Sequence, residues 1–256
     1  MNTAASTWLL TIRTIVQFPR NPMVLVFAVV PVLMMFLVFG ALFESVKQLP
    51  GFPTDNYYEY LAAAAVLMTT VPGISNSAIT LASDFQNRYL YKLLTTPAST
   101  GSIMLGRLLG DGLRLYVQAG GMLLLTMAFG ARIETGFAGA LLMLLLGTLF
   151  AVVTFGVLTA NIALKTKDAA AVQAVYPMAW LLIFLTTAFQ TSAQIESGVL
   201  RAITKANPTE YVLRAMRDLM LNGYDWDGIG LAFLVIVGLG AVGFPLTILN
   251  YRSVYR

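Results

Sequence analysis

The chain carries few charged side chains, and three of them recur at the spacing of one helix face. Arg107, Asp111 and Arg114 lie at positions i, i+4 and i+7, which brings a carboxylate between two guanidinium groups on one side of a helix. The spacing predicts an ion network at the inner end of a membrane helix, because charges placed there generally pair with one another. The alternative is a lever that transmits movement from the segment before it.

That preceding segment, residues 84–97, has the pattern of a short amphipathic helix. Asp84 stands in the first turn, where it complements the helix dipole, and Pro97 ends the helix. Arg88 and Lys92 share a face with Asp84. Tyrosine and arginine are enriched at protein interfaces, so one hypothesis is that the segment docks a partner protein. The other is a helix on the membrane surface whose basic side chains reach water. The residues expected at the docking surface are Asp84, Phe85, Arg88, Tyr89, Tyr91, Lys92, Leu93, Leu94 and Pro97.

Several kinds of catalytic and metal site are excluded by composition. The chain has no Cys and no His, which removes thiolate nucleophiles, Ser-His-Asp triads, Cys-ligated zinc or iron–sulfur sites and histidine proton relays. None of the lysines follows a glycine, so the phosphate-binding loop G-x-x-x-x-G-K-S/T is also absent. If the protein uses ATP, another polypeptide must hydrolyse it.

The elements that carry these residues belong to an integral membrane protein. Hydrophobic residues make up 58% of the 256 residues and charged residues 11%, against about 25% charged residues in soluble domains. The mean hydropathy is +0.76. The net charge of +4 is interpreted as a result of membrane topology, in which basic residues gather on one side. Nucleic-acid binding would instead need a basic patch on a solvated surface. We expect one all-α membrane domain over residues 1–256.

Six stretches are long and apolar enough to cross a bilayer, which takes about 20 residues for each helix. With both termini in the cytoplasm, ten of the sixteen basic residues and three of the twelve acidic residues fall on the inner side. That excess agrees with the positive-inside rule, so a multi-pass protein with two cytoplasmic termini is expected. The predicted spans are residues 23–43, 60–81, 103–129, 137–164, 172–189 and 229–250.

Residues 1–21 precede the first span. Trp8, Ile12 and Val16 recur at helical spacing beside Arg13, a pattern that favours an interfacial helix along the inner leaflet. A weakly ordered tail is the alternative. A full-length apolar span follows without a small-residue cleavage site, so the first span is expected to be retained and not to act as a signal peptide.

Neutral polar residues within the spans are the candidates for a substrate path. Thr69, Gly73, Asn76 and Thr80 form one stripe on the second span. In the fifth span, Thr187 stands between aromatic residues. A neutral polar stripe facing aromatic rings suits a bulky amphiphilic cargo better than a bare ion, whereas hydrogen bonding between helices is the alternative role for such residues. The candidates from the fifth span are Phe184, Thr187 and Phe189.

The stretch between the fifth and sixth spans, residues 191–226, predicts two short outer helices. In the second of them Asn207 is the N-cap, Pro208 takes the first helical position and Glu210 completes an arrangement like a capping box. Glu210 and Arg214 are an i, i+4 ion pair. The two helices could dip back into the outer leaflet as a lid over a path, or lie flat on the surface.

Taken in order along the chain, these pieces resemble the type-2 permease family of ATP-binding-cassette exporters, and most closely its daunorubicin-resistance-type branch. The likeness covers nearly the whole chain. It is carried by four pieces: Arg13 through Arg20-Asn21-Pro22 to Phe39-Gly40; Asp84 through Pro97 and Gly106-Arg107 to Arg114; Lys165-x-Lys167-Asp168; and Asn207-Pro208-Thr209 through Arg217 to Gly223.

The resemblance implies a permease of a bacterial inner membrane that dimerises, alike or with a sister subunit, and binds two separate ATPase subunits. Residues 84–100 would then be the coupling loop that rests on the ATPase, residues 1–21 the connecting helix, and spans two and five the lining of the path at the dimer interface. The chain itself would hold no cofactor, while ATP and Mg²⁺ would bind the partner. The expected cargo is an amphiphilic drug or lipid. Export of a polysaccharide or glycolipid is the alternative on the same scaffold, and an ion-coupled carrier or membrane enzyme is the alternative from another class.

Overall fold

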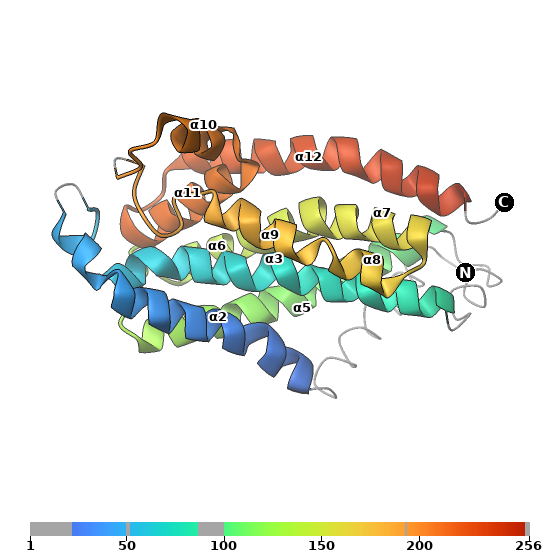
Figure 1. Ribbon diagram of the computed structural model, residues 1–256, viewed down its shortest axis with the longest axis horizontal. Helices are drawn as coiled ribbons and strands as arrows, with labels where there is room; N and C mark the ends of the chain where they lie inside the picture. Colours follow the sequence, from blue (N-terminus) through green and yellow to red (C-terminus); the bar gives the residue numbers. More distant parts are fainter. Residues whose placement is uncertain (1–21, 50–51, 87–99, 193, 254–256) are drawn as a thin grey trace.

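A computed structural model describes residues 22–49, 52–86, 100–192 and 194–253 (Figure 1). Every regular element within these ranges is a helix, which confirms the all-α class. The expected interfacial helix at residues 1–21 and most of the expected docking segment, residues 87–99, lie outside the described residues. The docking residues Arg88, Tyr89, Tyr91, Lys92, Leu93, Leu94 and Pro97 therefore stay sequence predictions.

Five of the six predicted spans correspond to long helical segments, and the fifth span is shorter and broken. The helix bounds are α2 Pro22–Leu42, η1 Glu44–Gln48, α3 Tyr57–Gln86, α5 Thr100–Ala128, α6 Gly136–Ala151, η2 Val152–Gly156, α7 Val157–Thr166, α8 Ala169–Gln173, α9 Tyr176–Phe184, α10 Gly198–Ala206, α11 Pro208–Leu221 and α12 Trp226–Ser253. Among the described residues, two segments are long and apolar enough to cross a membrane by length and composition, namely Gly136–Thr166 and Trp226–Asn250.

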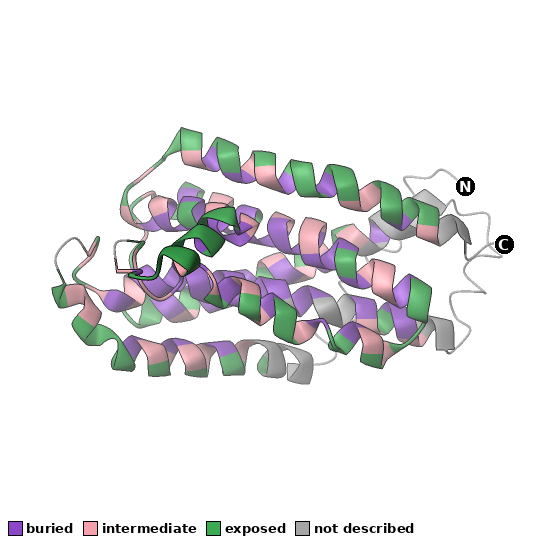
Figure 2. Cartoon of the chain, turned by 45° about the horizontal axis from the view of Figure 1, so that its top comes forward, coloured by how far each residue is buried: buried purple, intermediate pink, exposed green. Residues whose placement is uncertain are grey.

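Helix α3 forms the centre of the bundle. From Tyr60 to Val71 every residue on it is buried, which is the pattern of a helix surrounded on all sides. Four consecutive alanines, residues 62–65, let neighbouring backbones approach closely. Helices α2, α5, α6, α7, α9 and α11 all pack against α3. Figure 2 shows buried residues in the middle of the bundle and exposed ones along the outward side of α12.

Three connections gather at one end of the bundle: residues 43–56, 129–135 and 185–225 (Figure 1). The Asn56 amide donates to the carbonyl oxygen of Gly130 at 3.1 Å. The backbone N–H of Glu134 donates to Met220 O at 2.8 Å, and the Thr135 hydroxyl donates to Leu219 O at 2.6 Å. In the topology that the sequence predicts, these three connections are on the outer side, and that assignment stays a prediction.

The predicted single helix over residues 172–189 is wrong, because the chain there is broken twice. Asp168 caps α8 by accepting from the Ala170 N–H at 3.0 Å, and a turn at Ala174 follows. The helix restarts as α9, with Pro177 in its first turn, where the missing N–H of proline costs nothing. It ends at Phe184, five residues before the predicted end.

The fourth span also departs from a regular helix. Residues 152–156 form a π-helical turn between α6 and α7. Threonine hydroxyls within and after this turn bond back to earlier carbonyl oxygens: Thr154 donates to Phe150 O at 2.5 Å and Thr159 to Phe155 O at 2.6 Å. Such back-bonding competes with the backbone ladder and bends helices, which accounts for a local change of hydrogen-bonding pattern here.

Helix α12 is held to the bundle by small residues and by amides. Gly243 is close enough to α7 that a Cβ atom there would lie 2.6 Å from Val157 Cγ1, whereas a Cβ at Gly238 would meet nothing within 4 Å. Nearer the end of α12, the Asn161 amide donates to the Thr247 hydroxyl at 2.8 Å and the Asn250 amide donates to Asn161 Oδ1 at 2.6 Å. Close packing and interhelical hydrogen bonds are how membrane helices associate.

The two glycines on α12 make a matched test of this packing. Gly243→Ala should lower thermal stability by about 1–3 kcal/mol, because the new methyl group overlaps Val157, a β-branched side chain with little rotamer freedom in a helix. Gly238→Ala should leave stability equal or raise it, since alanine favours the helix and the space is open. The measurement is thermal unfolding of the two purified variants in the same detergent. Equal stability of the two variants would contradict close packing of α12 on α7.

Candidate transport site

The second short helix that the sequence predicts after the fifth span is present as α11. Asn207 begins this helix by accepting from the Thr209 N–H at 3.0 Å, and Pro208 occupies the first turn, as the sequence predicts. Gly223, with φ of +103°, follows the helix, and its N–H bonds to Asp218 O at 2.9 Å. Glycine accommodates that left-handed conformation without strain.

Helix α11 lies inside the bundle and not flat on its surface. It packs against α3, α6 and α12. Its apolar face is fully buried and consists of Val212, Leu213, Met216, Leu219 and Met220. The preceding helix, α10, differs because most of its residues, including Val199 and Ile203, are exposed. Burial of α11 within the bundle separates it from α10, while the expectation that both helices dip into the outer leaflet as a lid stays a prediction.

The Glu210 carboxylate is buried and binds the chain just after α9. Its Oε2 accepts from the Thr187 N–H at 2.7 Å and its Oε1 accepts from the Thr187 hydroxyl at 2.8 Å. Arg214 donates its Nε–H to Glu210 Oε1 at 2.6 Å, so the predicted ion pair is present. The capping-box role expected for Glu210 is wrong, because the Asn207 N–H bonds to Thr204 O instead.

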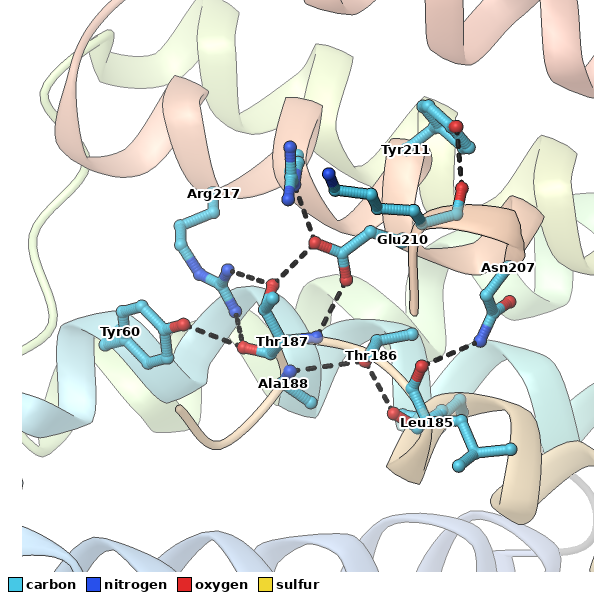
Figure 3. A network of polar contacts seen from close by, with 12 residues as sticks. Tyr60, Leu185, Thr186, Thr187, Ala188, Asn207, Glu210, Tyr211 and Arg217 are labelled. Carbon is cyan, nitrogen blue, oxygen red and sulfur yellow. Dashed lines mark hydrogen bonds and ion pairs between the residues drawn. The ribbon is translucent and has the colours of Figure 1, made fainter. Parts of the chain in front are cut away.

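Arg217 follows Glu210 on α11 and approaches the same threonine. Its side chain is 8% exposed. Two guanidinium nitrogens donate to Thr187, one to the hydroxyl at 3.0 Å and one to the carbonyl oxygen at 2.8 Å. The guanidinium carbon lies 3.8 Å from the ring centroid of Tyr60, which is a cation–π contact. The threonine thus connects a buried anion with a buried cation (Figure 3).

The chain leaves α9 through hydrogen bonds from Leu185 N–H to Leu181 O at 3.0 Å and from Thr186 N–H to Ile183 O at 3.2 Å, and neighbouring side chains bond the backbone around and beyond them. Tyr60 donates its hydroxyl to Thr187 O at 2.7 Å, and Tyr57 donates to Phe189 O at 2.6 Å. The Asn207 amide donates to the carbonyl oxygens of Leu182 and Leu185, at 2.6 and 3.2 Å. Irregular backbone at membrane depth is tolerated only where protein groups satisfy it. The polar network of Figure 3 therefore holds this break in place.

Two members of this network, Tyr57 and Tyr60, are absent from the sequence-based site. They stand at the start of the second predicted span, where tyrosines ordinarily mark the interface between membrane and water. A buried tyrosine hydroxyl usually finds a hydrogen-bond partner. The pair of tyrosines at the start of one helix was therefore the available signal for buried hydroxyl groups. It could not name their partners, which are more than a hundred residues away in the chain.

An aromatic row runs from the broken span onto α2. Ring centroids lie 6.3 Å apart for Trp180 and Phe184, 5.3 Å for Phe184 and Phe189, and 4.7 Å for Phe189 and Phe39. Phe189 also closes a crevice between α2 and α3, lined by apolar residues, with a volume of about 10 Å³. That space is no larger than a water molecule needs. The row places Phe184 and Phe189 together with residues of α2 that the sequence does not single out.

The stripe predicted on the second span is divided between different surroundings. Thr69 and Gly73 are buried and face α5: Gln118 donates to Thr69 O at 3.3 Å, and a Cβ at Gly73 would lie 2.7 Å from Leu115 Cδ2. Thr80 is exposed, and the side chain of Asn76 lies outside the described residues. Contact with α5 corresponds to the alternative role of helix packing, and a role in the path stays a prediction.

The charged residues at the inner end are described in part. Asp111 is buried, and Arg114 donates to the carbonyl oxygen of Gly73 at 2.9 Å. The side chains of Arg107, Asp84 and Phe85 lie outside the described residues. The three-residue ion network therefore stays a prediction, while Arg114 gains a backbone partner on α3 that the spacing did not indicate.

The loss of stability on removing the Glu210 carboxylate distinguishes this buried network from an exposed ion pair. Glu210→Ala should destabilise the protein by about 3 kcal/mol or more, since Arg217 is left buried without a compensating charge. The control is Glu44→Ala, which removes the exposed Glu44–Lys47 pair and should leave stability unchanged. Thermal unfolding of both purified variants measures the difference. An equal, small effect would contradict a stabilising role for the network.

Known proteins match the chain over most of its length. Residues 5–221 match the family described as ABC-2 type transporter. The daunorubicin resistance ABC transporter permease protein DrrB1 of Streptomyces coeruleorubidus is 28% identical over 258 residues, which cover 94% of this chain and 84% of that protein. Together with the all-helical bundle and its apolar helices, these matches confirm the resemblance drawn from the sequence. The chain belongs to the ABC-2 type transporter family and is a membrane subunit of an ATP-binding-cassette transporter.

Proposed function

We propose that the chain forms, with a second permease copy or a sister subunit, the export path for an amphiphilic drug or lipid. The observation that carries the proposal is the end of the fifth span. There a non-helical turn is held by buried charges on one side, Glu210 and Arg217, and continues into an aromatic row on the other, through Phe189 and Phe184. An amphiphile needs both surfaces, because its apolar body and its polar group must each be desolvated favourably.

A dimer would add space that the crevice within one chain does not provide. The crevice beside Phe189 holds about 10 Å³, whereas ligand pockets for drug-sized molecules measure roughly 300–1,000 Å³. The outward face of α9, which includes Met178, Leu181 and Phe184, is exposed. A second permease facing α9 would enclose a path between two such surfaces. This supports the dimeric assembly that the family resemblance implies.

The driving energy comes from separate subunits. The chain has no phosphate-binding loop of the G-x-x-x-x-G-K-S/T type, so ATP and Mg²⁺ belong to two cassette ATPases. Residues 84–100 dock these ATPases. Six spans cross a bacterial inner membrane, and both termini lie on its cytoplasmic side. ATP binding would close the ATPase pair, move the docking loop and shift the permease between inward-facing and outward-facing states.

ATP-driven transport into inverted membrane vesicles or liposomes tests the function directly. The permease and the cassette ATPase that co-purifies with it are reconstituted with daunorubicin as the probe, and its accumulation is followed by fluorescence. Accumulation should require ATP and should be absent with a proton or sodium gradient alone. Gradient-driven transport by this chain without ATP would favour an ion-coupled carrier. Glycosyltransferase genes beside this one, with no drug or lipid transport, would favour polysaccharide export.

The docking assignment has its own test, in the segment that the sequence singles out. Arg88→Glu with Lys92→Glu should reduce co-purification of the ATPase and ATP-driven efflux by about tenfold, because both changes reverse charge on the expected contact face. Lys47→Glu, on an exposed turn at the other end of the bundle, is the control and should change neither. Intact efflux and intact co-purification in the double variant would reject the docking surface.

A further inference from the structure

Helix α3 has a weak point in the middle of its length. Pro72 has no backbone N–H, so the intrahelical ladder lacks one hydrogen bond there. Just before it, two threonine hydroxyls bond back into the preceding turn: Thr69 donates to Ala65 O at 2.8 Å and Thr70 to Leu67 O at 3.0 Å. Both features loosen the helix ladder and favour bending.

Two side chains from α5 span this weak point. Gln118 donates its amide N–H to Thr69 O at 3.3 Å, before Pro72, and Arg114 donates to Gly73 O at 2.9 Å, after it. The two donors are four residues apart, so they lie on one face of α5. We call Arg114 and Gln118 the α5 brace.

Packing holds the brace against α3. Gly73 has no side chain, and a Cβ there would lie 2.7 Å from Leu115 Cδ2 and 3.3 Å from the Gln118 amide nitrogen. Leu115 is completely buried and Gln118 is 3% exposed. A larger residue at position 73 would force the Leu115 side chain to shift and would crowd the Gln118 amide.

We propose that Arg114 and Gln118 are positioning residues of the transport cycle, which brace α3 across Pro72 so that its outer half follows its inner half. The proposal rests on the proposed function, because α3 and α5 are the two helices that flank residues 87–99, the expected docking segment. The outer half of α3 carries Tyr57 and Tyr60, which hold the broken end of the fifth span through Phe189 O and Thr187 O. Movement of the docking segment thus reaches the break through one braced helix.

The brace itself is tested on the full chain alone, in lipid nanodiscs, by backbone hydrogen exchange over residues 69–80. The double variant Arg114→Met with Gln118→Leu should exchange about tenfold faster there, as expected for the loss of two hydrogen bonds to the backbone. Arg201→Met is the matched control, because Arg201 also donates to a backbone carbonyl, that of Ile195, at 2.6 Å. Unchanged exchange over residues 69–80 in the double variant overturns the brace.

The positioning role is tested with the co-purified ATPase in liposomes, by measuring ATP hydrolysis and daunorubicin transport together. The double variant should keep ATP hydrolysis within about twofold and lose transport by about tenfold. The single variant Arg114→Lys keeps a hydrogen-bond donor at position 114 and should retain transport. Adding Pro72→Ala to the double variant should cause no further loss, since both act at one site.

The outcomes separate the two proposals. Equal losses of hydrolysis and transport, unchanged transport, or a further loss on adding Pro72→Ala would each overturn the positioning role. If the unaltered complex shows no ATP-driven transport, the proposed function fails, while the hydrogen-exchange result still decides whether the brace exists.

Discussion

The structure depends on one constraint: a backbone polar group inside a membrane must be satisfied by the protein itself. The fifth span breaks at Phe184, and every feature around it follows from that break. Tyr60 on α3 and Arg217 on α11 donate to the carbonyl oxygen of Thr187, and Glu210 on α11 accepts from its N–H. To reach them, α11 must enter the bundle, which is why a helix with so many polar residues is buried. Near Pro72, side chains also reach the backbone of α3, since Arg114 donates to Gly73 O and Gln118 donates to Thr69 O.

Local features of the sequence predicted local structure well. The Asn207 cap, Pro208 at the helix start and the Glu210–Arg214 pair all depend on spacings of four residues or fewer. The long apolar stretches likewise predicted five of the long helical segments. Each of these signals is contained within one helix, so the neighbours of that helix need not be known.

Features that depend on distant residues could not be predicted in the same way. The partners of Glu210 and Arg217 are on the fifth span and on α3, and the rings of Phe189 and Phe39 are 150 residues apart. Hydropathy could not reveal the break after Phe184, since the residues that follow are still largely apolar. Glu210 had two possible partners, and tertiary contact with Thr187 prevailed over the local capping arrangement.

The π-helical turn at residues 152–156 affects how the chain aligns with its relatives. A π turn closes over five residues where an α turn closes over four, so it takes up an additional residue without rotating the helices on either side. Phe150 before it and Val157 after it both keep buried positions. A relative with a regular helix here would be one residue shorter and still present the same faces to α3 and α12. A one-residue gap in an alignment at this point would therefore record a bulge gained or lost, with the packing of the bundle unchanged.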